Sequence, residues 1–189
     1  MERSSNQLFV NLDMKNLMLL FSLLLAFNSY SQKDSLRFPQ DFYGIYKGDL
    51  KITNSKGRQT IGMEFHLNKT DSIGKYQYTL VYIMNGNRQE RLYNLIEKDA
   101  TKGEYVVDEN NGILLDAKVV DNTLYSLFEV QGNLLTTTER FYKDHMIFEI
   151  TFANTANKVT SGTEGENATE VLSYPVSVVQ KAYLKKQKN

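Results

Sequence analysis

The feature that most constrains this chain is a two-residue alternation of apolar and polar side chains, which recurs along residues 42–152. Over residues 61–68 the apolar positions are Ile61, Met63, Phe65 and Leu67, and the positions between them are Gly62, Glu64, His66 and Asn68. Successive side chains of a β-strand point to opposite faces of the sheet, so this period is typical of half-buried strands. The chain is therefore expected to fold from strands.

Short turns join the alternating segments. Asn85-Gly86 is the strongest hairpin signal, because both central residues of a type I′ turn need positive φ. The predicted strands are residues 42–52, 61–67, 75–84, 88–97, 104–108, 113–120, 123–130, 134–142, 146–152 and 169–180. No amphipathic helical segment separates these strands, and parallel βαβ units are therefore not expected.

A long antiparallel sheet in which each strand pairs with the next tends to close on itself, since closure removes exposed edges. We therefore predict an all-β fold, a single antiparallel up-and-down β-barrel of about 8–10 strands. A two-sheet β-sandwich is the alternative. The alternation also predicts which side chains point into the barrel. They are Met63, Phe65, Tyr78, Tyr82, Phe128, Phe148 and Ile150.

The C-terminal part of the chain breaks the regular rhythm. Residues 154–168 are rich in Asn, Thr, Ser, Gly and Glu, which predicts an exposed polar loop. Pro175 restricts the closing strand to an edge, a strand start or a bulge. Residues 176–188 also fit a short amphipathic helix, with Val179 and Tyr183 on one side, and this remains an alternative.

The N-terminus has the pattern of an export signal. Lys15 precedes an apolar run at residues 17–27, and the small residues Ser29 and Ser31 follow it. The run is shorter than the roughly 20 apolar residues that a membrane-spanning helix needs. The pattern predicts cleavage after Ser31, with an uncleaved membrane anchor or a buried hydrophobic helix as the alternatives.

These signals predict the domain organisation. Residues 1–31 form a signal peptide, with a start at Met14 as an alternative, and residues 32–189 form one barrel domain. The mature protein would begin at Gln32, would have no transmembrane span, and would be secreted or periplasmic.

Composition excludes several classes of function. The chain has 22 Lys and Arg against 22 Asp and Glu, so it lacks the basic excess expected of a nucleic-acid-binding protein. It has no Cys, which removes disulfides, thiolate nucleophiles, zinc–thiolate sites and iron–sulfur clusters. A multi-histidine metal site is disfavoured by the two His residues. We expect no metal, no cofactor and no enzymatic activity.

The first strand carries a family resemblance. Gly44-Ile45-Tyr46 lies near the start of that strand and resembles the Gly-x-Trp motif of lipocalins, members of the calycin group. The resemblance implies that Tyr46 plugs the closed end of a barrel and that an Arg packs over it, for which Arg140 is the candidate. It also implies binding of a small hydrophobic molecule inside the barrel.

Tyrosines are the candidate ligand-binding residues. Tyr78, Tyr82 and Tyr93 lie in two strands joined by the Asn85-Gly86 turn, and a tyrosine offers a large apolar body with a polar tip. Arg140 completes the predicted ligand-binding set. The candidates to hold an anionic end of a ligand are Arg88, Arg91 and Arg140. Core packing or an exposed aromatic patch would produce the same tyrosine pattern.

Three hypotheses of function follow. The first is a barrel that binds a small hydrophobic or amphipathic ligand. The second is a cavity-free module that binds a protein or a glycan through its outer strands or through residues 154–168. An enzyme on a calycin barrel is the third. A ligand barrel is expected to contain a pocket of about 300 Å³ or more lined by Tyr and Phe.

Overall fold

The chain divides into two units, Met1–Ser35 and Leu36–Asn189. The computed structural model of the protein describes residues 36–188, all of which belong to the second unit. The predicted signal peptide, residues 1–31, lies outside the described residues. In residues 36–188, no helix is long and apolar enough to cross a membrane.

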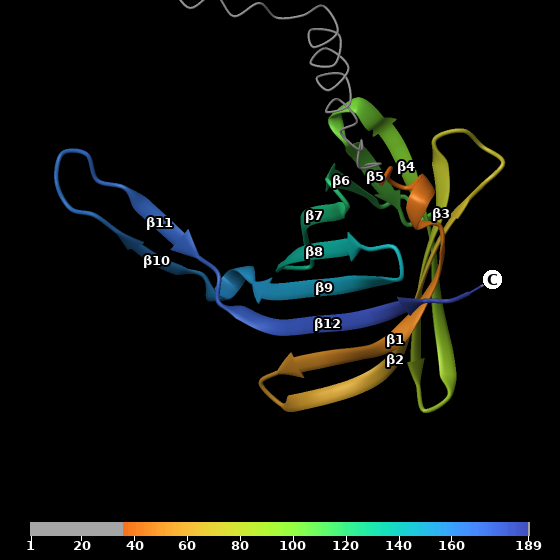
Figure 1. Cartoon of the computed structure of the whole chain (residues 1–189). Coiled ribbons are helices and arrows are strands. Elements are labelled where there is room, and N and C mark those ends of the chain that lie inside the picture. Colours follow the sequence, from red (N-terminus) through yellow and green to blue (C-terminus); the bar gives the residue numbers. More distant parts are fainter. Residues whose placement is uncertain (1–35, 189) are drawn as a thin grey trace, which may run out of the picture. The chain divides into compact units, whose positions relative to one another are not determined.

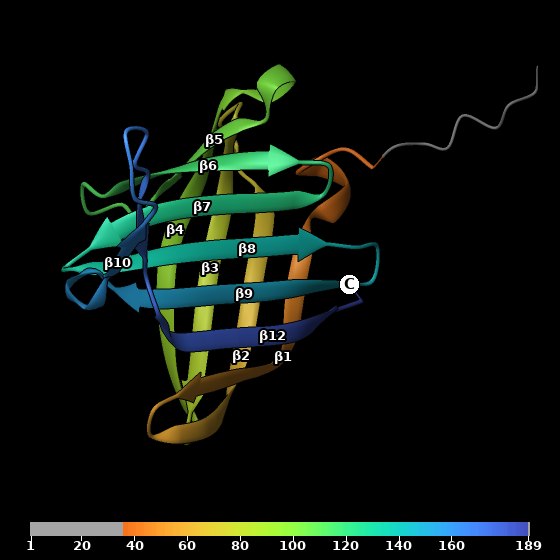
Figure 2. The same ribbon diagram turned by 90° about the vertical axis from the view of Figure 1, so that its left-hand side faces the viewer.

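Ten strands form a closed antiparallel barrel (Figures 1 and 2). They are β1 (Gly44–Asn54), β2 (Gly57–Lys69), β3 (Lys75–Met84), β4 (Asn87–Asp99), β5 (Glu104–Asp108), β6 (Leu114–Val120), β7 (Thr123–Val130), β8 (Asn133–Phe141), β9 (His145–Asn154) and β12 (Val176–Lys186). Each strand up to β9 pairs with the next, and β12 closes the barrel between β9 and β1. The predicted up-and-down barrel is confirmed, and the two-sheet sandwich is wrong.

The closing strand differs from its prediction. Because β12 begins directly after Pro175, the proline marks a strand start, and the alternative of a helix over residues 176–188 is wrong. The segment is a strand because its backbone hydrogen-bonds to two neighbours, β1 on one side and β9 on the other. A helix here would leave both neighbours with unpaired backbone groups.

A second, two-stranded sheet interrupts the barrel order. It consists of β10 (Val159–Gly162) and β11 (Glu170–Ser173), inserted between β9 and β12, and it projects away from the barrel wall (Figure 1). Part of the segment predicted as a polar loop, residues 154–168, is therefore β10 together with the short 3₁₀ helix η3 (Thr155–Asn157). A second such helix, η2 (Ala100–Lys102), joins β4 to β5.

The predicted inward faces have the right phase. Tyr78 pairs with Leu67, Phe65 with Leu80 and Met63 with Tyr82 across β2 and β3, so these alternate residues share the inner face. The large side chains that are fully buried are Tyr46, Phe42, Phe65, Phe141, Phe148, Leu50, Met63, Leu67, Leu95, Leu124, Met146 and Leu184. Inward packing of alternate residues thus produces one apolar core.

One end of the barrel is closed by aromatic side chains. The 3₁₀ helix η1 (Gln40–Phe42) lies at this end, and the rings of Phe38, Phe42 and Phe141 pack together with centroids 5.5–6.2 Å apart. Tyr46 is completely buried beneath them, and its hydroxyl donates a hydrogen bond of 2.6 Å to the Phe42 carbonyl. The burial predicted for Tyr46 is confirmed.

The cation over Tyr46 is Lys186, so the predicted contact between Tyr46 and Arg140 is wrong. The Lys186 ammonium lies 5.7 Å from the centre of the Tyr46 ring. Gly44 leaves room for this lysine, because a Cβ there would lie 2.8 Å from the Lys186 Cε. Arg140 is exposed on the outer face, since its neighbours Glu139 and Phe141 are the inward, buried residues of β8.

The opposite end carries the β1–β2, β3–β4 and β7–β8 turns. The predicted turn at Asn85-Gly86 is present, with φ of +53° and +78°. Most other connections at this end are equally short, apart from the β9–β12 connection that contains the projecting hairpin. This end is called the open end below, for the reason given next.

Candidate functional site

The interior at the open end is lined by apolar side chains that point inward but remain partly exposed. They pack against the buried core and yet are only half-buried, and we call this set the cup: Ile52, Ile61, Tyr82, Tyr93, Phe128 and Phe152. A side chain that points into a barrel keeps solvent contact only where the barrel is open. The cup side chains therefore keep contact with solvent at this end, whereas aromatic side chains seal the other end. None of the depressions described below is lined by the tyrosines and phenylalanines of the cup.

A buried carboxyl group lies deeper in the barrel than the cup. Glu139 of β8 is 1% exposed and Tyr78 of β3 is 5% exposed. The Tyr78 hydroxyl donates a hydrogen bond of 3.1 Å to Oε1 of Glu139, while Oε2 is buried and has no hydrogen-bond partner within residues 36–188. This pair joins two strands that are not neighbours in the barrel, β3 and β8.

Burial controls the protonation of this pair. Loss of solvent raises the pKa of Glu139 to about 8, although the nearby hydroxyls of Tyr78 and Thr137 favour the charged form. The pKa of Tyr78 is raised well above 10, first by its burial and then by the adjacent Glu139. At neutral pH, Glu139 is therefore mostly a neutral carboxylic acid in an apolar interior.

Aromatic packing fixes the Tyr78 ring. It packs edge-on against Phe65 with 4.9 Å between ring centres, and it stacks on Tyr93 with 6.2 Å between centres. Tyr93 belongs to the cup, so one continuous aromatic surface leads from the open end to the buried carboxyl group.

A cation stands at the mouth of the cup. Arg91 lies two residues before Tyr93 on β4 and shares its inward face, but it is exposed. Its guanidinium carbon is 5.9 Å from the centre of the Tyr82 ring, and its Nη1 donates a hydrogen bond of 3.4 Å to the Tyr93 hydroxyl. Arg91 therefore links two cup tyrosines and places a positive charge beside the cup.

The β-ladder between β6 and β7 is short. Only three residue pairs connect these strands, Lys118–Tyr125, Val119–Leu124 and Val120–Thr123. Beyond them lies a depression of about 630 Å³, whose lining includes outward residues such as Asp116 and Leu127 and inward residues such as Ser126 and Thr137. This depression therefore lies on the barrel wall where β6 and β7 are no longer paired.

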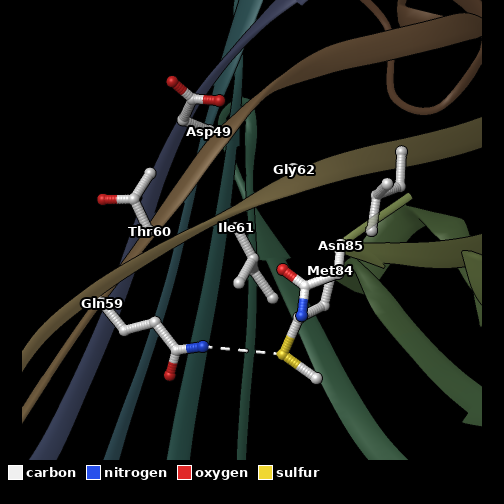
Figure 3. A pocket seen from close by; sticks show the side chains of 8 residues that line it. Asp49, Gln59, Thr60, Ile61, Gly62, Met84 and Asn85 are labelled. Atoms are coloured by element: carbon white, nitrogen blue, oxygen red, sulfur yellow. Dashed lines mark hydrogen bonds between the residues drawn. The ribbon is translucent and has the colours of Figure 1, made fainter. Parts of the chain in front are cut away.

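A third feature is smaller and polar. A depression of about 270 Å³ lies at the open end of β2 and β3, and Figure 3 shows Gln59 donating to the Met84 sulfur beside Ile61. Its sole ionisable lining residue is Asp49. Within residues 36–188, no group of three or more His, Asp or Glu side chains is placed to hold a metal ion.

The structure brings three of the four predicted ligand-binding residues together. Tyr78, Tyr82 and Tyr93 share the inner face of β3 and β4. Arg140 does not join them, because it points outward and donates to the Thr123 hydroxyl over 3.4 Å. Arg91 is the arginine that reaches the tyrosines.

Arg88 has a different role on the outer wall. Its two terminal nitrogens donate to the carboxylate of Glu64 at 2.9 and 3.0 Å. Lys47 and His66 contact the same carboxylate at 3.0 and 2.9 Å. Hydrogen bonding from Arg88 is the main reason that the pKa of Glu64 lies far below its usual value, despite burial. Arg88 is thus committed to a structural ion pair.

Sequence reasoning missed Glu139. The signal that could have found it is a break in the pattern: Leu135, Thr137, Glu139 and Phe141 occupy the inward positions of β8, and one of these positions carries a carboxyl group. A charged residue at an inward, apolar position is costly unless it has a partner or a function.

Comparison with known proteins supports the fold alone. A scan against models of protein families found no match, and a search of curated proteins found no match. Among solved structures, the chain is similar to the S-type phycobiliprotein lyase CPES from Guillardia theta, with a TM-score of 0.54 and 7% identity, covering 79% of this chain and 90% of that one. The class defined by fold and site is a closed antiparallel barrel whose inward apolar side chains are partly exposed at one end.

Proposed function

We propose that this protein binds a small hydrophobic or amphipathic molecule in the cup at the open end of its barrel. One observation carries the proposal: six inward-pointing apolar side chains at this end are only half-buried, although they pack on the core. Water-exposed apolar surface inside a concave site favours an apolar ligand, since its burial contributes roughly 25 cal/mol per Å².

The two polar features of the site support an amphipathic ligand. Glu139 lies deep in the interior and Arg91 stands at the mouth, so a ligand with an apolar body meets polar groups at both ends of its path. We propose the depression between β6 and β7 as a second route of access. The finer resemblance to lipocalins is part of this proposal, with Gly44, Tyr46 and Lys186 forming the sealed end.

Binding rather than catalysis is proposed. The Glu139 carboxyl group is paired with the hydroxyl of Tyr78, whose pKa is raised well above 10, and a neutral acid beside a neutral phenol is a poor acid–base pair at neutral pH. We also propose that the protein acts outside the cytoplasm, after cleavage behind Ser31, on the basis of the N-terminal sequence pattern.

Titration with diphenylhexatriene, a hydrocarbon dye that fluoresces in apolar surroundings, tests the proposal. The protein is expected to bind the dye saturably. Phe128→Ala should weaken this binding by about tenfold, as expected for the loss of one buried aromatic contact. Tyr183→Ala is the matched control, because Tyr183 is an outward aromatic residue of β12 that is 51% exposed.

Two outcomes would contradict the proposal. One is the absence of saturable dye binding by the unaltered protein. The other is an equal loss of affinity in Phe128→Ala and Tyr183→Ala, because the dye would then sit on the outer surface.

A protein-interaction role is the second candidate, favoured by the projecting hairpin. Val159, Val171 and Leu172 are 53%, 49% and 40% exposed on β10 and β11. This candidate predicts association that depends on the hairpin and no uptake of the dye. Replacing residues 159–173 with a Gly/Ser linker should leave dye binding intact if the cup is the functional site.

A further inference from the structure

We propose that the ligand carries a nitrogen with an N–H hydrogen, as an amine does, and that Oε2 of Glu139 accepts a hydrogen bond from it. This inference rests on the proposed function and specifies the chemistry of the molecule that enters the cup. Glu139 would then be a ligand-binding residue at the inner end of the site.

The first step is the missing partner of Oε2. Buried polar atoms in proteins nearly always have a hydrogen-bond partner, because an unpaired polar atom loses its water without compensation. Within residues 36–188, Oε2 of Glu139 is buried and has none, whereas Oε1 accepts from Tyr78. Both oxygens are acceptors once the carboxyl group has released its proton to solvent, so an N–H donor from outside the chain would pair with Oε2 as the carboxyl group ionises.

The second step is the surroundings of Glu139. Its cross-strand neighbours on the inner face are Leu124 of β7 and Phe148 of β9, both fully buried and without polar side-chain atoms. Arg91, the cation nearest the cup tyrosines, is engaged by Tyr82 and Tyr93 at the mouth. The hydroxyl of Thr137 lies near the carboxyl group, but it makes no hydrogen bond to Oε2. Among the described residues, Oε2 is therefore left for a ligand.

The third step is access. Thr137 lies two residues before Glu139 on the same inward face of β8, and Thr137 also lines the depression between β6 and β7. Tyr93 of the cup stacks on Tyr78, which contacts Glu139 directly. A ligand that displaces side chains of the cup would therefore approach the carboxyl group along these tyrosines.

The fourth step is selection among donors. An ammonium group beside the carboxyl favours its ionised form and gains a charge-assisted hydrogen bond. A hydroxyl group is a weaker, neutral donor. An ionised fatty acid offers no donor, and its charge would be buried beside a carboxyl group. The expected order of affinity is therefore amine, then alcohol, then carboxylate.

Displacement of bound diphenylhexatriene by three competitors of equal chain length tests this order. The competitors are dodecylamine, dodecanol and dodecanoate, each below its micelle-forming concentration. Dodecylamine is expected to displace the dye at about tenfold lower concentration than dodecanol, as one charge-assisted hydrogen bond allows. Dodecanoate should be weakest.

The variant Glu139→Gln has the same size and cannot ionise. In this variant the ratio of displacing concentrations between dodecanol and dodecylamine, each measured against the variant's own dye affinity, should fall close to one. Glu149→Gln is the matched control, because Glu149 also lies on the barrel wall but pairs with Lys181 outside, at 2.7 Å. That control should retain the full preference for the amine.

The outcomes separate this inference from the proposed function. Equal displacement by amine and alcohol in the unaltered protein would overturn the role of Glu139 while leaving the ligand barrel in place. An amine preference that survives in Glu139→Gln would do the same. A protein that takes up no dye and none of the three competitors would overturn the proposed function, and the inference with it.

Discussion

Glu139 should make the stability of this protein fall as the pH rises from acidic to mildly alkaline values. Its pKa is about 8 in the folded protein against 4.5 for a solvated glutamate, and burial is the main cause. Between these two values the folded state holds a proton that the unfolded state has released. The free energy of unfolding therefore decreases with pH in this window, and it is constant, as far as Glu139 is concerned, outside it.

The size of the effect follows from the shift. Each pKa unit corresponds to about 1.4 kcal/mol, so the full effect is about 5 kcal/mol. A pH of 5.0 lies just above the pKa of the solvated glutamate, and a pH of 8.5 lies just above the pKa of Glu139 in the folded protein. Between these two pH values, about 4 kcal/mol of the effect should be lost. That is a large part of the roughly 5–15 kcal/mol that stabilises a typical domain.

Urea unfolding at pH 5.0 and 8.5 measures this loss, with Glu139→Gln as the test variant and Glu149→Gln as the control. An amide does not titrate, so Glu139→Gln should lack this decrease and should be more stable than the unaltered protein at pH 8.5. The control should show the same decrease as the unaltered protein. Equal pH dependence in the unaltered protein and in Glu139→Gln would refute the reasoning, because it would mean that the carboxyl group reaches water.

Three further predictions concern other parts of the molecule. Phe148→Ala should lower the free energy of unfolding by about 3–5 kcal/mol, because Phe148 is completely buried. Tyr82→Ala in the half-buried cup should lower it by less than about 3 kcal/mol and should weaken dye binding. Equal losses for the two variants in urea unfolding would count against an open cup. Tyr46→Phe should cost about 1–3 kcal/mol by the same measurement, since the Phe42 carbonyl loses its buried donor. The intact mass of the exported protein should correspond to a chain that begins at Gln32; a mass that includes residues 17–27 would contradict cleavage.

Much of the fold could be predicted from the sequence because the alternation of side chains is local. Packing in a strand has a period of two, so the positions of Met63, Phe65 and Phe148 on the inner face follow from their neighbours in the chain alone. The Asn85-Gly86 turn is equally local, since the positive φ of both residues is a property of that dipeptide. The number of such strands favoured closure but left a two-sheet sandwich open, and the pairing of β12 with β1 decides between them.

The partners across the barrel could not be predicted in this way. Lys186 rather than Arg140 lies over Tyr46, because closure brings the last strand beside the first, and the parity of β8 turns Arg140 outward. The residues before Val176 form a hairpin instead of a plain loop, which depends on the pairing of β10 with β11.

The sequence by itself determined an all-β fold of antiparallel strands with alternating faces, because those properties depend on neighbours along the chain. Only the tertiary structure decided which polar groups meet inside. Tyr78 and Glu139 are 61 residues apart, and their hydrogen bond exists because the closed barrel places β3 opposite β8. The same closure removes Glu139 from water and leaves its Oε2 without a partner, so the chemistry of the site is a product of the fold.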